Sequence, residues 1–187
     1  MRELKILEVL EELLAVKSFD ALTTSDIAER AGFSRASMYF YFSSKQEALV
    51  ALFARTVEAL REKSRAAADD PAAPRDAIAT AVARTRDRWR EHGLIMRVAL
   101  DQSSNIPEIG TLWTETAEIF IDAITAILVR AGVASHDGPD GARALAHAVC
   151  WMIERTFYRA SAISPEALDQ AAETCRVVWS RVAGIEA

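Results

Sequence analysis

The sequence predicts an all-α protein of about nine helices, and three observations support this fold class. Apolar residues recur at helical spacing along the chain, and no stretch shows the alternation of a β-strand. Glycine and proline are few, 7 and 5 of 187 residues, and most fall where a helix would end. The chain is 51% apolar, which is enough to build a core in one or two compact units.

The N-terminal helices can be placed one after another along the chain. The first is expected over 2–17, where leucines form one apolar stripe. Two short helices follow within 23–42, and the turn between them falls at Gly32, a residue suited to positive φ. A longer helix is expected from Lys45 to about 67.

The remaining helices are separated by breaks that the sequence marks clearly. Loops are expected over Asp69–Pro74 and Ser135–Gly141, and a further break at the dipeptide His92-Gly93. Ser164 gives an N-cap with proline directly after it for the last helix. The expected helices are 75–91, 93–102, 105–132, 140–161 and 164–183.

The most informative stretch is 23–49, because two short helices joined by a tight turn form a helix-turn-helix. Thr23 or Thr24 can cap its first helix, and a serine, Ser34, can cap its second. In the second helix, Met38 and Phe42 form the buried stripe, so the other side chains point largely outward. This pattern is typical of a DNA-binding element.

The same stretch resembles the DNA-binding domain of the TetR family of bacterial transcriptional regulators. The resemblance implies a helix-turn-helix domain over 1–45 and a ligand-binding and dimerisation domain over 46–187. It also implies a repressor that binds a palindromic operator and is released by a small hydrophobic ligand. The matching residues are Thr24, Asp26, Ile27, Ala28, Ala31, Gly32, Phe33, Ser34, Met38, Tyr39, Tyr41, Phe42, Lys45 and Leu49.

Carried onto the matching positions, the resemblance gives candidate DNA contacts. Arg35, Ala36 and Ser37 open the second helix and are expected to meet base edges, with Arg35 suited to a bidentate guanine contact. Residues 1–45 carry six Lys/Arg against seven Asp/Glu, so a broad basic patch is absent and few phosphate contacts per subunit are expected. The other candidates are Thr24, Ser25, Ser34, Tyr39, Tyr41 and Lys45.

Beyond this domain the chain is similar to the ethionamide-repressor subgroup of the family. The similarity rests on Thr111-Leu112-Trp113, Glu154-Arg155-Thr156 and Trp179, together with Tyr39-Phe40-Tyr41-Phe42 in the DNA-binding domain. It implies an apolar ligand channel, although a packed core would use the same large residues. The matching positions are Val82, Trp89, Ala117, Phe120, Ile124, Cys150, Ile153 and Trp179.

One departure from the subgroup concerns the polar anchor of the ligand. Where the subgroup places two asparagines, this chain has Cys150 and Ile153, so a drier pocket is expected. The neighbouring Glu154-Arg155 pair fits a structural ion pair or an interface contact better than an anchor. The candidate anchors, which the sequence does not rank, are Thr116, Thr125, Tyr158 and Glu154.

The last two expected helices, 140–161 and 164–183, carry apolar residues on more than one face. A helix with two apolar faces needs two partners. The resemblance to the TetR family implies that these two helices pair with their copies in a homodimer. The helix that begins at Lys45 joins both domains and is expected to couple ligand binding to DNA binding.

Several other classes of function are disfavoured. No run of about 18 apolar residues suggests a membrane span, and charged residues follow Met1, so a cytoplasmic protein is expected. Cys150 and Cys175 are expected to be packing thiols rather than a disulfide, and no motif for a metal, a cofactor or an enzyme is present. The near-neutral domain leaves one alternative, a helical protein that binds a ligand or a partner without recognising DNA sequence.

Overall fold

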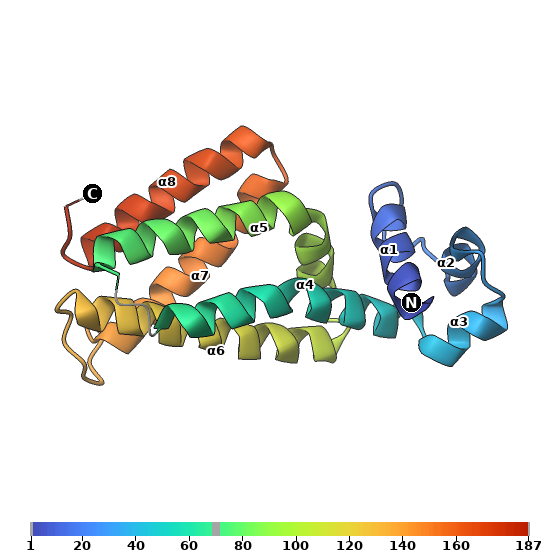
Figure 1. The fold of residues 1–187 in the computed structure, drawn as a ribbon, viewed down its shortest axis with the longest axis horizontal. Helices are drawn as coiled ribbons and strands as arrows, with labels where there is room; N and C mark the ends of the chain where they lie inside the picture. Colours follow the sequence, from blue (N-terminus) through green and yellow to red (C-terminus); the bar gives the residue numbers. More distant parts are fainter. Residues whose placement is uncertain (1, 69–71, 187) are drawn as a thin grey trace. The chain divides into compact units, whose positions relative to one another are not determined.

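The computed structural model describes residues 2–68 and 72–186, and all regular structure in these ranges is helical, which confirms the all-α prediction. The expected loop Asp69–Pro74 lies partly outside the described residues. Within the described ranges, none of the helices combines the length and the apolar character that crossing a bilayer requires. The helices are α1 (Arg2–Leu14), α2 (Thr24–Ala31), α3 (Arg35–Tyr41), α4 (Lys45–Ala68), α5 (Pro74–Gln102), α6 (Pro107–Arg130), α7 (Ala142–Ser161) and α8 (Pro165–Val182) (Figure 1).

Helix α5 accounts for the difference between these eight helices of the described ranges and the nine or so expected. A break was expected at His92-Gly93, and His92 does leave the helical range, with φ −125° and ψ 15°. The expected break is therefore confirmed: the segments 75–91 and 93–102 are helical on either side of it, and α5 spans both of them across the kink.

The described residues form two compact units. Unit 1 comprises the chain up to Val57 together with Leu94–Leu112. Within it α1 packs on α2, and α2 packs on α3. The segment 1–45, expected to bind DNA, falls inside this unit. Its most buried side chains, at most 1% exposed, include Ile6, Leu10, Leu22, Ile27, Met38 and Leu49.

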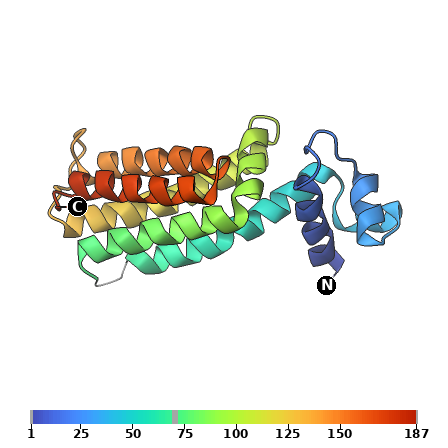
Figure 2. The same ribbon diagram turned by 90° about the horizontal axis from the view of Figure 1, so that it is seen from above.

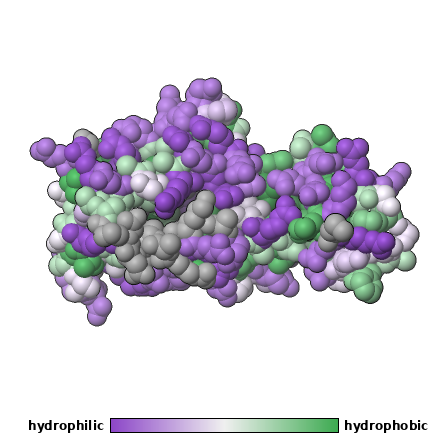
Figure 3. All heavy atoms as spheres, in the orientation of Figure 1, coloured by the Kyte–Doolittle hydropathy of each residue, from purple (hydrophilic) through white to green (hydrophobic). Residues whose placement is uncertain are grey.

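Unit 2 comprises Glu58–Gly93 and the chain from Trp113 onward. Its helices α7 and α8 lie side by side and run in opposite directions, as Figure 2 shows. On the face drawn in Figure 3, hydrophilic residues cover most of the surface and hydrophobic ones form smaller areas between them. The core includes Ile78, Val82, Trp89, Ile121, Leu128, Phe157 and Cys175.

Candidate DNA-binding and ligand-binding sites

The entry and exit of α2 are fixed by a matched pair of caps. Thr23 Oγ1 accepts a bond from the Asp26 N–H at 3.1 Å, and Asp26 Oδ2 accepts one from the Thr23 N–H at 2.8 Å. Gly32 adopts φ 75°, and its N–H donates to the carbonyls of Ala28 and Glu29. Residues that carry a side chain rarely adopt this φ. Glycine therefore ends the helix at little cost in free energy, as the sequence indicated.

Asp26 also holds α2 against the end of the preceding segment. Lys17 Nζ lies 2.8 Å from Asp26 Oδ2. This hydrogen bond, followed by those from the backbone and side chain of Thr23, lowers the pKa of Asp26 to about 2. The carboxylate is therefore charged at every physiological pH, and it fixes the start of the helix-turn-helix.

The start of α3 is held by two serines. Ser34 Oγ accepts a bond from the Ser37 N–H at 3.1 Å and lies 2.9 Å from Ser37 Oγ. The expected cap is thus confirmed, and Met38 and Phe42 are 0% and 4% exposed as the apolar stripe indicated. Seven residues make a helix too short to be stable alone, so this packing keeps α3 in place.

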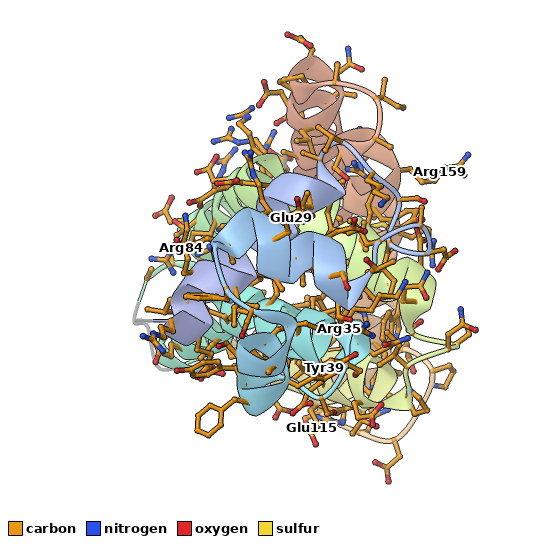
Figure 4. All side chains as sticks on the ribbon, turned by 90° about the vertical axis from the view of Figure 1, so that its right-hand side faces the viewer. Glu29, Arg35, Tyr39, Arg84, Glu115 and Arg159 are labelled. Atoms are coloured by element: carbon orange, nitrogen blue, oxygen red, sulfur yellow. The ribbon has the colours of Figure 1, made fainter. Side chains whose placement is uncertain are left out.

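Three of the expected DNA contacts form one hydrogen-bonded chain on the exposed side of α3. Arg35 Nη2 donates to the Tyr39 hydroxyl at 3.2 Å, and that hydroxyl lies 3.3 Å from Thr24 Oγ1. The Arg35 guanidinium also lies over the Tyr39 ring, 5.5 Å from its centroid. Figure 4 shows Arg35 and Tyr39 beside each other on α3. The bonds from Thr24 and then Arg35 lower the pKa of Tyr39.

Lys45 has a different position from the other candidates. Its ammonium donates to the carbonyls of Phe19 at 2.8 Å, Asp20 at 3.1 Å and Leu22 at 2.7 Å. It also lies 4.8 Å from the centroid of the Phe19 ring. An ammonium has three N–H donors, so all of them are used inside the protein. In this conformation Lys45 closes the connection between α1 and α2 onto α4 and has no donor left for a phosphate.

The remaining candidates lie around the same surface. Ser25 and Ala36 are exposed, while Tyr41 is half-buried and meets the ring of Phe40 edge-on at 5.2 Å. Phe40 is 82% exposed, which sequence analysis did not single out. The sequence indicated this exposure in one way, because Phe40 lies outside the apolar stripe formed by Met38 and Phe42.

Several basic side chains of unit 1 contact other parts of the same unit. Lys17 pairs with Asp26, and Arg30 Nη2 lies 3.3 Å from Glu12 Oε2. Lys45 is likewise bonded inside the unit. Arg35 differs from these residues, because its contacts are with Tyr39 on the exposed side of α3. The surface is therefore suited to a few specific contacts more than to broad electrostatic binding.

The eight expected ligand contacts all belong to unit 2, on helices α5 to α8. Seven of them are at most 9% exposed, and Phe120 is half-buried. Burial of this kind is expected of a packed core and of an apolar pocket alike, so these contacts stay a prediction. Trp89 meets Tyr158 edge-on at 6.4 Å, and Trp113 meets Phe120 at the same distance.

Both cysteines are free and buried. Burial raises the pKa of Cys175 to about 11. Burial, followed by the negative charges of Glu154 and Glu118, raises the pKa of Cys150 to about 12. Neither thiol is therefore disposed to ionise at neutral pH, as expected of packing residues.

The candidate polar anchors have unequal surroundings. Thr125 Oγ1 donates to the Ile121 carbonyl at 2.7 Å, a bond within its own helix. The Glu154 side chain is only 10% exposed and lies 3.9 Å from Arg155 Nε, and burial raises its pKa. A further polar group, which sequence analysis did not consider as an anchor, is the indole N–H of Trp179. It is buried, and no acceptor in the described part of the chain reaches it.

The second apolar face expected on α7 and α8 is present. Val149 and Ile153 are buried, whereas Trp151 is 41% exposed. Residues of the same two helices with half-buried apolar side chains are Leu145, Met152, Val177, Val178 and Val182. A protomer alone thus leaves apolar surface of both helices partly open to solvent.

Comparison with known families and proteins gives consistent matches. Residues 6–52 match the model of bacterial regulatory proteins of the tetR family, and residues 78–182 match that of the C-terminal domain of the transcriptional regulator EthR. The HTH-type transcriptional regulator EthR of Mycolicibacterium smegmatis is 30% identical over 168 residues, which cover 86% of this chain and 75% of that protein. EthR of Mycobacterium tuberculosis is 31% identical over 163 residues, covering 84% and 74%.

Solved structures share the fold at lower sequence identity. A TetR transcription regulator from Haloarcula marismortui has a TM-score of 0.77 at 17% identity, over 98% of this chain and 96% of that one. FadR of Thermus thermophilus, a TetR family repressor in complex with lauroyl-CoA, has a TM-score of 0.64 at 18% identity, over 96% and 93%.

Proposed function

The chain belongs to the TetR family of bacterial regulatory proteins, with a C-terminal domain of the EthR type, and on that premise we propose that it is a transcriptional repressor. In this proposal it binds a palindromic DNA operator as a homodimer and leaves it when a small hydrophobic effector binds unit 2. The observation that carries the proposal is the exposed chain of Thr24, Tyr39 and Arg35 on the helix-turn-helix.

Helix α3 is the element that reads the operator. Its first residues, Arg35, Ala36 and Ser37, meet base edges in the major groove, and the guanidinium of Arg35 donates to one guanine. Lys45 is left out of the contact set, because its three donors are bonded to backbone carbonyls. The side chains that hold the DNA backbone or support α3 are Thr24, Ser25, Ser34, Tyr39 and Tyr41.

The dimer forms through α7 and α8. Their half-buried apolar side chains, together with the exposed Trp151, gain a second partner when two copies meet about a two-fold axis. Such an axis presents two α3 helices to successive major grooves, roughly 34–36 Å apart along the duplex. Each DNA-binding domain makes few phosphate contacts, and the dimer gains affinity because its two domains bind the two half-sites of one operator together.

The effector binds among the apolar residues expected to line a channel in unit 2. It weakens DNA binding only if its affinity differs between the operator-bound and the released conformation. Helix α4 begins in unit 1 and ends in unit 2, so it connects the two sites through one continuous helix. As a regulator of bacterial genes, the protein acts in the cytoplasm.

The experiment that tests the proposal is selection of bound sequences from a randomised duplex pool, at about 150 mM salt to suppress weak phosphate binding. A palindromic motif is expected. Arg35→Ala should then cost roughly 1–3 kcal/mol of discrimination at one base pair of each half-site.

Arg30→Ala is the matched control, because Arg30 is exposed, carries the same charge and pairs with Glu12 on α1. It should preserve the motif. Enrichment of no motif, or an unchanged motif with Arg35→Ala, would support instead a helical protein that binds a ligand or partner without reading DNA sequence.

A further inference from the structure

The indole N–H of Trp179 is a buried hydrogen-bond donor that has no acceptor among the residues the structure describes. Trp179 is 2% exposed, and none of the described residues offers an acceptor to its Nε1. Indole nitrogen donates and does not accept, so its need can be met only by an oxygen or another acceptor atom. Most buried polar groups in folded proteins have a partner, and an exception calls for an explanation.

Trp179 lies on α8, which packs against α7 within unit 2. Cys175 on α8 lies near Thr156 on α7, whose side chain acts to lower the pKa of that thiol. One turn further along α8, Trp179 is level with the part of α7 around Met152 and Ile153. The side chains of Met152 and Ile153 are apolar, and the backbone carbonyls within a helix are bonded inside it.

We propose that the effector presents an uncharged hydrogen-bond acceptor, such as a ketone, ester or amide carbonyl, to the indole N–H of Trp179. The rest of the effector is apolar and contacts the apolar residues of α5 to α8 that are expected to line a channel. This inference rests on the proposed function, because it names the chemistry of the ligand that the same unit binds.

The charges in unit 2 favour an uncharged acceptor over an anion. Glu118 and Glu154 both act on Cys150, which lies one turn before Glu154 on α7, and their negative charges disfavour its thiolate. Arg143, a cation close to this region, is already bonded to Asp122 at 2.6 Å and Glu118 at 2.7 Å. A carboxylate buried in this region would lose its hydration and be repelled by the negative charges of Glu118 and Glu154, whereas an uncharged acceptor avoids both costs.

The test uses three small probes that share a benzene ring: acetophenone, with an uncharged carbonyl, ethylbenzene, without an acceptor, and benzoate, with a charged one. The protein is labelled with ¹⁵N in its four tryptophans, so that each indole N–H gives its own NMR signal. Trp179→Phe, which keeps an aromatic ring and removes the donor, assigns the signal of Trp179.

Acetophenone is expected to move the Trp179 indole proton downfield, the direction of a new hydrogen bond, while ethylbenzene leaves it without that shift. In Trp179→Phe, the affinity for acetophenone relative to ethylbenzene should fall about tenfold. Trp113→Phe is the matched control, since Trp113 is a tryptophan of the same unit without a bare buried N–H, and the affinity ratio should be unchanged.

Three results would overturn the inference: a Trp179 signal that does not move at saturating acetophenone, an affinity ratio that Trp179→Phe leaves unchanged, or benzoate binding at Trp179 at least as tightly as acetophenone. Binding of none of the probes would also overturn it. If Trp179→Phe does not fold, single Trp→Phe variants of the other three tryptophans assign the Trp179 signal by elimination, and the shift in the unsubstituted protein then decides. Operator selection needs no ligand, so failure here leaves the proposed DNA recognition standing.

Discussion

Replacing Lys45 with glutamine separates a structural role from a role in DNA binding. Its ammonium holds the carbonyls of Phe19, Asp20 and Leu22 and lies over the Phe19 ring. Glutamine removes the charge, leaves two N–H donors in place of three, and has a shorter side chain that no longer reaches the three carbonyls together. We therefore expect Lys45→Gln to lower the stability of unit 1.

The size of the effect follows from the three bonds. Those to Phe19 and Leu22 are partly buried and the one to Asp20 is exposed, so only two contribute appreciably. At about 1 kcal/mol net for each, and with about 0.5 kcal/mol from the ring contact, the loss is about 2–3 kcal/mol. For a chain of this length that corresponds to a fall in Tm of about 5–10 °C.

The assay is urea unfolding followed by circular dichroism and by tryptophan fluorescence. All four tryptophans lie in the ranges of unit 2, so circular dichroism is the signal that also reports on unit 1. Lys5→Gln makes the same change of charge at an exposed residue of α1 and should leave the unfolding midpoint in place.

The opposite outcome would refute the structural reasoning. If Lys45 instead binds a phosphate, Lys45→Gln will leave the midpoint unchanged and reduce the slope of log affinity against log salt by about 0.9 for each phosphate that the lysine neutralises. A variant as stable as Lys5→Gln with a smaller salt slope would therefore show that the carbonyl bonds do not stabilise unit 1 and that Lys45 contacts phosphate.

Three further outcomes are expected from substitution, pH and chemical labelling. Gly32→Ala should destabilise the fold by about 1–2 kcal/mol in urea unfolding, because the φ of 75° strains any side chain although the space around it is open. The pKa of Asp26 is lowered to about 2, so the contribution of its charged carboxylate to folding stability is present at neutral pH and is lost as pH falls from roughly 4 through 2. Asp26→Asn should remove that part of the acid dependence of Tm. With pKa values raised to about 12 and 11, Cys150 and Cys175 should react with a thiol reagent at pH 8 only after urea unfolds the protein, as mass spectrometry can measure.

The features that the sequence made predictable are local in the chain. Thr23 caps α2 and Ser34 caps α3 through bonds that span three residues, and Gly32 takes the one backbone conformation that glycine favours. These choices depend on propensities of neighbouring residues, so one sequence is enough to identify them. The apolar stripe of Met38 and Phe42 is also a local feature, because its two residues are four apart on one helix.

The features that escaped prediction depend on residues far apart in the chain. Lys45 bonds to carbonyls more than twenty residues earlier, and nothing in the local pattern separates a lysine that binds carbonyls from one that binds phosphate. The break at His92-Gly93 was located correctly, but whether it ends the helix or bends it depends on the packing around it. The bare N–H of Trp179 likewise depends on what surrounds a buried tryptophan.

The arrangement of Arg35 bears on how a nearly neutral domain binds DNA with specificity. An arginine that reads a base must give up rotamer freedom on binding, and that loss weakens its net contribution. Here the guanidinium already rests on the Tyr39 ring and bonds its hydroxyl, which Thr24 holds from α2. Part of the ordering therefore precedes contact with DNA, and Tyr39→Phe should weaken operator binding even if the Tyr39 hydroxyl touches no base. Since Lys17, Arg30 and Lys45 are engaged within the unit, discrimination in this domain depends on holding one arginine in place more than on attracting phosphates.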